Sequence, residues 1–252
     1  MKAPGDWWKT FFDGLAVEFW QAVIPEEATA EDAAFLWKHL ELEAGSRVLD
    51  VPCGSGRLTR PLAAGGCAMT GVDISEPSLR AARESGPAGN PHRPIEYRQA
   101  EMRDLPWTGE FDAAFCFGNS FGYLDDAGNE EFVRAVSRVL RPGGKFAIDY
   151  GQTAESVLPR LAPRQEADLA GFHFAEDTRY DPVSARVENV FTFSRDGKSE
   201  TRLASQRVYT LSEVLRLFAQ NGFEVLRYYG SPREEPFALA SHRLLLVAQR
   251  RE

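Results

Sequence analysis

The chain has 252 residues, of which 43% are hydrophobic and 26% charged, a composition typical of one large globular domain or of a domain with an inserted part. With 29 Lys and Arg against 37 Asp and Glu, the formal net charge of −8 disfavours a nucleic-acid partner. No apolar run approaches the roughly 20 residues of a membrane helix, and "MKAPGDWWKT" has no signal-peptide core. We therefore expect a cytoplasmic protein without membrane contact.

The cysteines and histidines show no pattern that suggests a metal site. Cys53, Cys67 and Cys116 form no CxxC pair, and their odd number is typical of reduced thiols in a cytoplasmic protein. The four histidines are scattered without the spacing of metal ligands. We expect no metal cofactor.

The amino-terminal stretch "WWKTFFDGLAVEFW" has helical periodicity, which predicts one amphipathic helix over residues 7–20. A second helix is predicted to start near Thr29 as its N-cap, with Asp32 three residues later. We interpret residues 1–44 as a helical lid. The apolar stripe consists of Trp7, Phe11, Leu15 and Phe19, widened by Trp8, Phe12 and Trp20.

Strands and helices are predicted to alternate from residue 45 to residue 152, which indicates a doubly wound α/β fold. Ser75 is predicted to cap a helix that runs to about Ser85, and 85–94 is predicted to be a loop. Polar side chains follow the strands where a ligand crevice is expected: they are Asp50, Asp73, Glu101 and Asn119. The predicted strands are 47–51, 67–74, 95–100, 111–118 and 146–150.

After Tyr150 the pattern changes to an antiparallel meander of three strand-like runs between about 169 and 210. "RDGK" (195–198) is predicted to be a hairpin turn. Helix 211–222 and strands 223–229 and 243–250 then return to the α/β pattern, which gives seven strands with the last one antiparallel. The expected domains are the lid (1–44), the α/β core (45–152), an inserted β cap (153–210) and the carboxyl-terminal part of the core (211–252).

The glycine-rich turn in "VLDVPCGSGR" (48–57) lets backbone N–H groups approach a ligand closely. The third glycine of a dinucleotide fingerprint is missing after Gly56, and so is the GK[ST] of a P-loop. Asp50 would repel a pyrophosphate but would pair with a cation. Asp73, at the end of the second strand, suits the diol of a ribose.

These segments together resemble the class I S-adenosylmethionine (SAM)-dependent methyltransferases. "VLDVPCGSGR" is similar to their first motif, with Pro52 where a glycine is usual, and "GVDIS" is similar to the second. "QAEMRDLPW" resembles the segment that lines the adenine, and "FDAAFCFGNSFGYL" resembles the fourth strand, whose exit faces the methyl group. "VLRPGGKFAID" is similar to the fifth strand and its turn.

The resemblance implies a Rossmann-like fold with SAM as methyl donor and S-adenosylhomocysteine (SAH) as product. In-line methyl transfer depends mainly on alignment inside a lidded site. Asn119 and Tyr123 are the candidate catalytic residues, as groups that position the acceptor. The implied cofactor-binding residues are Asp50, Cys53, Gly54, Gly56, Arg57, Asp73, Ile74, Glu101, Met102, Phe117 and Gly118, with Trp8, Phe12 and Trp20 covering SAM from the lid.

Several residues also have plain structural interpretations. Aromatic residues at helical spacing form a docking face more often than a cofactor box. His173 is expected to face solvent rather than act as a general base, and Cys53 to pack inside its turn. Tyr150, Arg207 and Tyr209 are weaker candidates for a catalytic role.

The insertion after the fifth strand resembles that of small-molecule N-methyltransferases, such as sugar N,N-dimethyltransferases and the glycine or sarcosine type. A small-molecule acceptor is therefore expected, with nitrogen favoured and oxygen or carbon left open, in a monomer or homodimer. Three alternatives remain: a non-catalytic SAM-binding protein, an NAD-dependent oxidoreductase and a nucleic-acid methyltransferase. The oxidoreductase lacks its glycine motif, and "GNSFGY" replaces the Asp/Asn-Pro-Pro-aromatic motif of the nucleic-acid enzymes.

Overall fold

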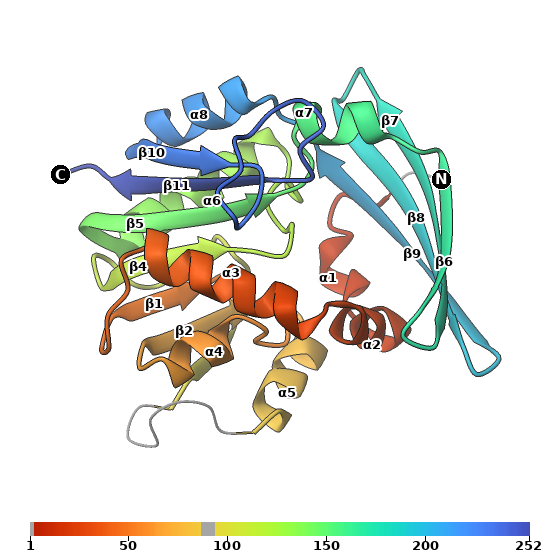
Figure 1. Cartoon of the computed structure of the whole chain (residues 1–252), viewed down its shortest axis with the longest axis horizontal. Coiled ribbons are helices and arrows are strands. Elements are labelled where there is room, and N and C mark those ends of the chain that lie inside the picture. The colour runs from red at the N-terminus through yellow and green to blue at the C-terminus, as the bar shows by residue number, and fades with distance from the viewer. Residues whose placement is uncertain (1–2, 87–93) are drawn as a thin grey trace.

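A seven-stranded mixed sheet forms the centre of the computed structural model, which describes residues 3–86 and 94–252 (Figure 1). The five strands β1 to β5 are parallel, and β11 runs antiparallel to both of its neighbours, as predicted. Most of the loop predicted at 85–94 lies outside the described residues. In spatial order the strands are β10 (Phe223–Tyr229), β11 (Leu244–Arg250), β5 (Leu140–Tyr150), β4 (Phe111–Cys116), β1 (Arg47–Asp50), β2 (Ala68–Asp73) and β3 (Glu96–Gln99).

Helices cover both faces of this sheet, so each face has its own hydrophobic core. α3 (Glu26–His39) and α4 (Thr59–Ala64) pack on one face, and α6 (Asp126–Val139) and α8 (Leu211–Gln220) pack on the other. The near-continuous apolar run of β4 is explained by this burial on both sides. The chain also forms α5 (Glu76–Glu84), α7 (Ala154–Val157) and the 3₁₀ turn Leu158–Arg160, besides the two amino-terminal helices described below. Ser75 caps α5 as predicted, accepting a hydrogen bond from the amide of Ser78.

A second sheet of four antiparallel strands stands beside the first. Its strands are β6 (Arg164–Leu169), β7 (Phe172–Asp181), β8 (Arg186–Arg195) and β9 (Lys198–Arg207). The hairpin turn predicted at 195–198 joins β8 to β9, with Asp196 and Gly197 at φ angles of 51° and 74°.

The prediction of three strands in this sheet was wrong, because β6 was missed. Ala170 and Gly171 have φ angles of 51° and 80°, and they turn the chain between β6 and β7 inside what reads as one strand. β6 is an edge strand whose residues are mostly exposed. It therefore lacks the apolar alternation from which a half-buried strand is recognised.

The amino-terminal segment forms two helices, α1 (Trp8–Phe11) and α2 (Gly14–Val23), so the prediction of one helix was wrong. Asp13 caps α2 through its side chain, and Gly14 has a φ angle of 55°, which breaks the helix. The predicted apolar stripe is nevertheless correct: Trp7, Phe11, Leu15 and Phe19 are all buried, in a cluster with side chains of β7, β8 and β9.

The predicted start of the second helix at Thr29 was also wrong. α3 begins at Glu26, after Pro25, and Thr29 lies within its second turn. Pro25 has the extended backbone of an N-cap residue, and because its side chain has no hydrogen-bonding group, α3 begins without a side-chain cap. Asp32 is buried and forms ion pairs instead of completing a capping box.

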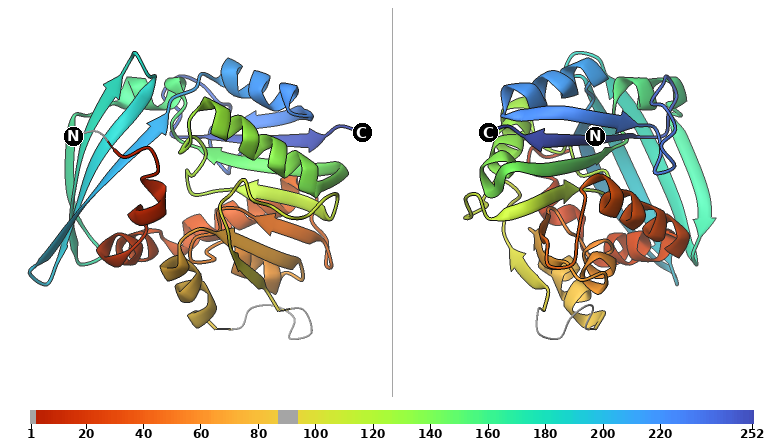
Figure 2. Two further views of the ribbon diagram at one scale, coloured as in Figure 1. Left: turned by 180° about the vertical axis from the view of Figure 1, so that it is seen from behind. Right: turned by 60° about the vertical axis from the view of Figure 1, so that its left-hand side comes forward.

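α1 and α2 lie between the two sheets, beside the carboxyl ends of β1 and β4 (Figures 1 and 2). Phe19 stacks on Phe174 of β7 with a centroid distance of 4.7 Å, and the indole of Trp7 donates to the backbone oxygen of Ser205 in β9 at 2.9 Å. The amino-terminal segment is thus held by the second sheet and faces the first. Within the described residues, no helix is long and apolar enough to cross a membrane.

Candidate functional site

Three adjoining cavities lie at the carboxyl edge of the seven-stranded sheet. The turn cleft, of about 680 Å³, is bordered by the glycine-rich turn 52–57, by α2 and by Phe117 and Gly118. The Asp73 cavity, of about 30 Å³, lies beyond the end of β2. The sheet chamber, of about 310 Å³, lies between the exit of β4, the amino-terminal helices and the second sheet. Phe12 lines all three cavities.

The glycine-rich turn takes its shape from two glycines in the left-handed region. Gly54 and Gly56 have φ angles of 54° and 76°. A Cβ atom on Gly56 would lie 2.5 Å from the hydroxyl of Tyr97, whereas one on Gly54 would meet nothing within 4 Å. Gly54 therefore leaves open space above the turn, and Gly56 allows close packing below it.

Asp73 is buried at the end of β2, where it organises the turn. Its Oδ2 accepts a hydrogen bond from the amide of Gly54 at 2.7 Å, and its Oδ1 accepts one from the amide of Ser75 at 2.8 Å. Burial raises the pKa of Asp73, and these backbone hydrogen bonds oppose the rise. Its carboxylate lines the Asp73 cavity together with Ile74.

Glu101, Met102 and Trp8 line the other walls of the Asp73 cavity. The Oε2 atom of Glu101 accepts from Arg103 at 2.6 Å, while its Oε1 atom is buried without a partner. The indole nitrogen of Trp8 is also buried without a partner. Two residues of the cavity wall thus carry an unpaired acceptor and an unpaired donor, each of which is costly to bury unless a ligand binds it.

Asp50 is the one predicted cofactor residue that lines none of these three cavities. It lies under the turn, where its Oδ2 accepts from the hydroxyl of Thr59 at 2.5 Å. Burial raises its pKa to about 8, opposed mainly by the hydrogen bond from Thr59. The structure therefore gives Asp50 a contact that holds the first turn of α4.

Arg57 belongs to a buried ion-pair network that sequence analysis missed. It contacts Asp32 of α3 at 2.9 Å, and Arg243 contacts the same carboxylate at 2.6 Å and Asp149 of β5 at 3.0 Å. Asp149 Oδ2 also accepts from the amide of Gly118 at 3.2 Å. The network joins α3, β5, β11 and the turn. Asp149 ends "FAID" on the fifth strand, so the rule that selected Asp50 and Asp73 could have found it.

Asn119 lies at the exit of β4 with a φ angle of 63°, a strained backbone conformation for a residue other than glycine. Its side-chain oxygen accepts from the amide of Gly151 at 2.8 Å, and its backbone oxygen accepts from Nε2 of Gln206 at 2.8 Å. Tyr123 stacks on Phe12 and lines both the Asp73 cavity and the sheet chamber. Both predicted catalytic residues therefore border the chamber.

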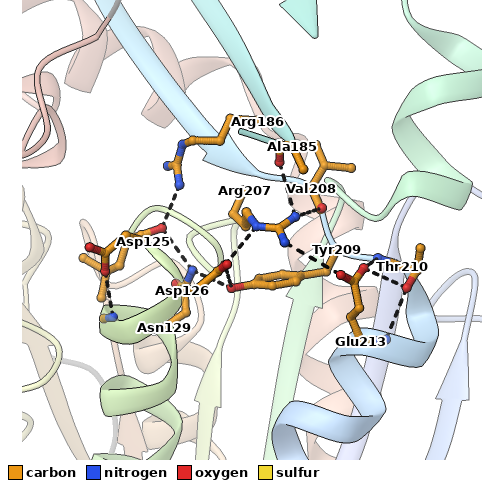
Figure 3. A network of polar contacts seen from close by, with 12 residues as sticks. Asp125, Asp126, Asn129, Ala185, Arg186, Arg207, Val208, Tyr209, Thr210 and Glu213 are labelled. Carbon is orange, nitrogen blue, oxygen red and sulfur yellow. Dashed lines mark hydrogen bonds and ion pairs between the residues drawn. The ribbon is translucent and has the colours of Figure 1, made fainter. Parts of the chain in front are cut away.

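Contacts from the second sheet hold the loop between Gly118 and Asp125 in place (Figure 3). Arg186 donates to the backbone oxygens of Tyr123 and Leu124, at 2.9 Å in each case. Asp126 Oδ1 accepts from Arg207 at 2.8 Å and from the hydroxyl of Tyr209 at 2.7 Å. These contacts place Arg207 and Tyr209 in the junction between the sheets.

The predicted site residues other than Asp50 border the turn cleft, the Asp73 cavity or the sheet chamber. The weaker catalytic candidates have structural contacts instead. Tyr150 is buried and donates to the backbone oxygen of Arg207. His173 is exposed and contacts Asp168 at 3.0 Å, as expected of a solvent-facing histidine. The turn cleft is lined by Cys53, Gly54, Gly56, Arg57, Phe117, Gly118, Phe12 and Trp20, and the Asp73 cavity by Asp73, Ile74, Glu101, Met102, Trp8 and Phe12.

Comparison with known proteins finds similarity to methyltransferases. Residues 48–144 match a family described as a methyltransferase domain. The chain is 25% identical to YqeM of Bacillus subtilis over 85% of this chain and 88% of YqeM. It is 32% identical to the glycine N-methyltransferase of Rattus norvegicus and 37% identical to the ubiquinone biosynthesis O-methyltransferase of Chromobacterium violaceum. These two matches cover 56% and 44% of the chain, and the chain spans about half of each of these two proteins (53% and 46%).

Solved structures share the whole fold, the second sheet included. The CcbJ methyltransferase of Streptomyces caelestis has a TM-score of 0.82 at 20% identity, over 97% of this chain and 99% of CcbJ. The sugar N-methyltransferase KedS8 of Streptoalloteichus has a TM-score of 0.70 at 21% identity, over 95% of this chain and 94% of KedS8. At these identities the likeness establishes the fold alone.

Proposed function

Because residues 48–144 match a methyltransferase domain and the fold is that of solved methyltransferases, we propose that the chain is a class I SAM-dependent methyltransferase that holds SAM across the turn cleft and the Asp73 cavity and methylates a small molecule bound in the sheet chamber. The observation that carries this proposal is the shared wall: Phe12 lines all three cavities, and Gly118 lines the cleft and the chamber. A donor and an acceptor in these spaces would meet beside the exit of β4.

The residues of the two cofactor cavities fit SAM in their chemistry. Glu101 and Trp8 supply an unpaired acceptor and an unpaired donor, and the space above Gly54 is free of protein atoms within 4 Å of an added Cβ. The carboxylate of Asp73 is fixed by two backbone amides and suits the diol of a ribose. Arg57, in the wall of the turn cleft, suits a carboxylate group.

When bound, SAM supplies an electrophilic methyl group on a positively charged sulfur. The residues of this chain bind SAM and the acceptor, align them with each other and exclude water. Asn119 and Tyr123 border the chamber where the acceptor has to be oriented, and the rings of Phe12 and Trp20 form part of its wall. Alignment and exclusion of water account for most of the acceleration that such a site needs.

The Asp73 cavity, at about 30 Å³, is the smallest of the three cavities. A nucleoside is far larger, so we expect the side chains of Trp8 and Phe12 to move when SAM enters. This behaviour fits the interpretation of the amino-terminal segment as a lid. In the structure, other aromatic rings cover these two side chains: Phe12 stacks on Tyr123, and Trp8 packs edge-on against Trp7.

A calorimetric titration of the purified protein with SAM, and then with SAH, tests this proposal, with NADH as the control ligand. We expect binding of SAM and SAH and no heat from NADH. A folded protein that binds neither SAM nor SAH would contradict the proposed function. Binding of SAM without turnover of any acceptor would instead favour a non-catalytic SAM-binding protein.

A further inference from the structure

The sheet chamber is lined by one acidic side chain, Glu176 of β7. We propose that Glu176 binds the cationic nitrogen of the acceptor, so that the acceptors of this enzyme are small amines that enter as ammonium ions. This inference rests on the proposed function, because it takes the chamber to be the acceptor site. It adds the chemical class of the substrate and a residue that selects it.

The register of the second sheet directs Glu176 toward the chamber. Glu176 lies opposite Phe191 of β8, and directly paired residues of neighbouring strands share one face of a sheet. Phe191 lines the chamber as well, as does Asn189, which donates a side-chain hydrogen bond to Oε1 of Glu176. The carboxylate is therefore held in place by its own sheet and faces the exit of β4, where Gly118 and Asn119 form the opposite wall.

Within residues 3–86 and 94–252, no cationic side chain balances this carboxylate. Among the described residues, those that line the chamber include no Lys, Arg or His. Arg202 lies on the same face of the sheet, opposite Phe191, but it pairs with Glu200 at 2.6 Å. An uncompensated carboxylate in a partly dry cavity is costly, and a cationic ligand would offset that cost.

The protonation of Glu176 follows from the same environment. Burial raises the pKa of Glu176, and the hydrogen bonds from Asn189 and Thr178 oppose the rise. An ammonium ion beside it would favour the charged carboxylate. Binding of the amine and ionisation of Glu176 are therefore expected to support each other. An ammonium nitrogen has no lone pair, so it must lose one proton before methyl transfer, and the Glu176 carboxylate beside it accepts that proton. The neutral amine can then attack the methyl group, and the methylated product carries the positive charge that the sulfur loses.

The other walls of the chamber suit a cation as well. They carry the six aromatic rings of Trp7, Phe11, Phe12, Trp20, Tyr123 and Phe191, and aromatic faces attract ammonium groups. The side-chain oxygen of Gln152, also in the chamber wall, is buried without a hydrogen-bond partner and can accept from an N–H group. A neutral alcohol of the same shape would gain less from these contacts, and an anion would be repelled by Glu176.

The experiment measures binding directly, by ligand-observed NMR, to the full-length protein saturated with SAH. The probes are three matched pairs: benzylamine with benzyl alcohol, ethanolamine with ethylene glycol, and glucosamine with glucose. We expect at least one amine to bind at least tenfold more tightly than its alcohol. In Glu176→Gln this preference should disappear, because the amide keeps the shape and the hydrogen bond to Asn189 but not the charge.

Glu166→Gln is the matched control, since Glu166 lies on the neighbouring strand β6, exposed and paired with Arg164. It should keep the preference for the amine. The inference is wrong if no amine binds, if the alcohols bind equally well, or if Glu176→Gln keeps the preference. SAH binding, measured by calorimetry on the same samples, separates this failure from that of the proposed function, which would show as a loss of SAH binding in the unmodified protein.

Discussion

Asp73 accepts a hydrogen bond from Gly54 of the glycine-rich turn, and each of these residues also shapes a cavity wall. The carboxylate of Asp73 fixes the amide of Gly54 while it also lines the Asp73 cavity. Gly54 keeps the space above the turn open because it has no side chain. A small residue and an acidic residue nineteen positions apart therefore shape one binding surface.

Replacing Gly54 by Ala should weaken the binding of SAH much more than it lowers the stability of the fold. Its φ angle of 54° costs an alanine roughly 1–2 kcal/mol, and the new methyl group meets no protein atom within 4 Å. We expect a small fall in stability and a loss of SAH affinity of at least tenfold, measured by calorimetry. Gly109→Ala is the control, because Gly109 has a φ angle of 63°, equally open space and no place in the three cavities. Equal SAH affinities in the two variants would contradict the assignment of the turn.

Asp50 should make stability depend on pH. Burial raises its folded-state pKa from 3.8 to about 8, so the folded chain binds an extra proton between these values. Its contribution to the free energy of unfolding is then fully present below pH 3.8 and is lost as the pH rises toward 8. Asp50→Asn removes this dependence, so the variant should gain stability relative to the unmodified protein from pH 5 to pH 8, as measured by urea unfolding. A constant difference would show that Asp50 is not protonated in the folded chain.

Sequence patterns could locate most of the residues that line the turn cleft and the Asp73 cavity, because these follow strands within short motifs. Asp32, Arg243 and Glu176 could not be found in this way. Asp32 and Arg243 are 211 positions apart and meet only when α3 packs against β11, which begins one residue after Arg243. Glu176 is one of several acidic residues on a polar strand, and only the pairing register shows that it faces the chamber.

At the scale of elements, the apolar stripe of the amino-terminal segment was predictable, but its division into two helices was not. Asp13 and Gly14 are a break signal that the regular spacing of Trp7, Phe11, Leu15 and Phe19 conceals. The seven-stranded sheet was predictable because its central strands are apolar and alternate with helices. β6 was not, because its pairing with β7 depends on backbone hydrogen bonds rather than on apolar burial.

The docking of α2 on the second sheet can be tested with two phenylalanines. Phe19 is 1% exposed and packs against Phe172, Phe174 and Phe193, so Phe19→Ala should cost about 3–5 kcal/mol of stability. Phe12 is only partly buried and lines all three cavities, so Phe12→Ala should cost less stability and weaken SAH binding more. Urea unfolding and calorimetry measure the two effects. The same pattern in both variants would show that the segment has no separate docking and covering faces.

At the scale of the whole molecule, the ion pairs of Arg243 connect α3 to β5, which are distant in sequence. It pairs with Asp32 and Asp149, whose side chains are 3% and 6% exposed, and its own side chain is 25% exposed. Arg243→Met leaves both carboxylates without this partner and should cost about 3–5 kcal/mol in urea unfolding. Arg233→Met breaks the exposed pair with Glu31 and should cost no more than about 1 kcal/mol. Equal losses would mean that the buried network does not join α3 to the sheet.

The position of α1 and α2 between the sheets also limits the timing of catalysis. One short segment, with Phe12 at its centre, covers the space proposed for the donor and the space proposed for the acceptor. We therefore expect a movement that uncovers one space to uncover the other, so that both products leave and both substrates enter in the same opening event. The frequency of that event then sets an upper limit on the turnover rate, however fast the methyl transfer itself becomes.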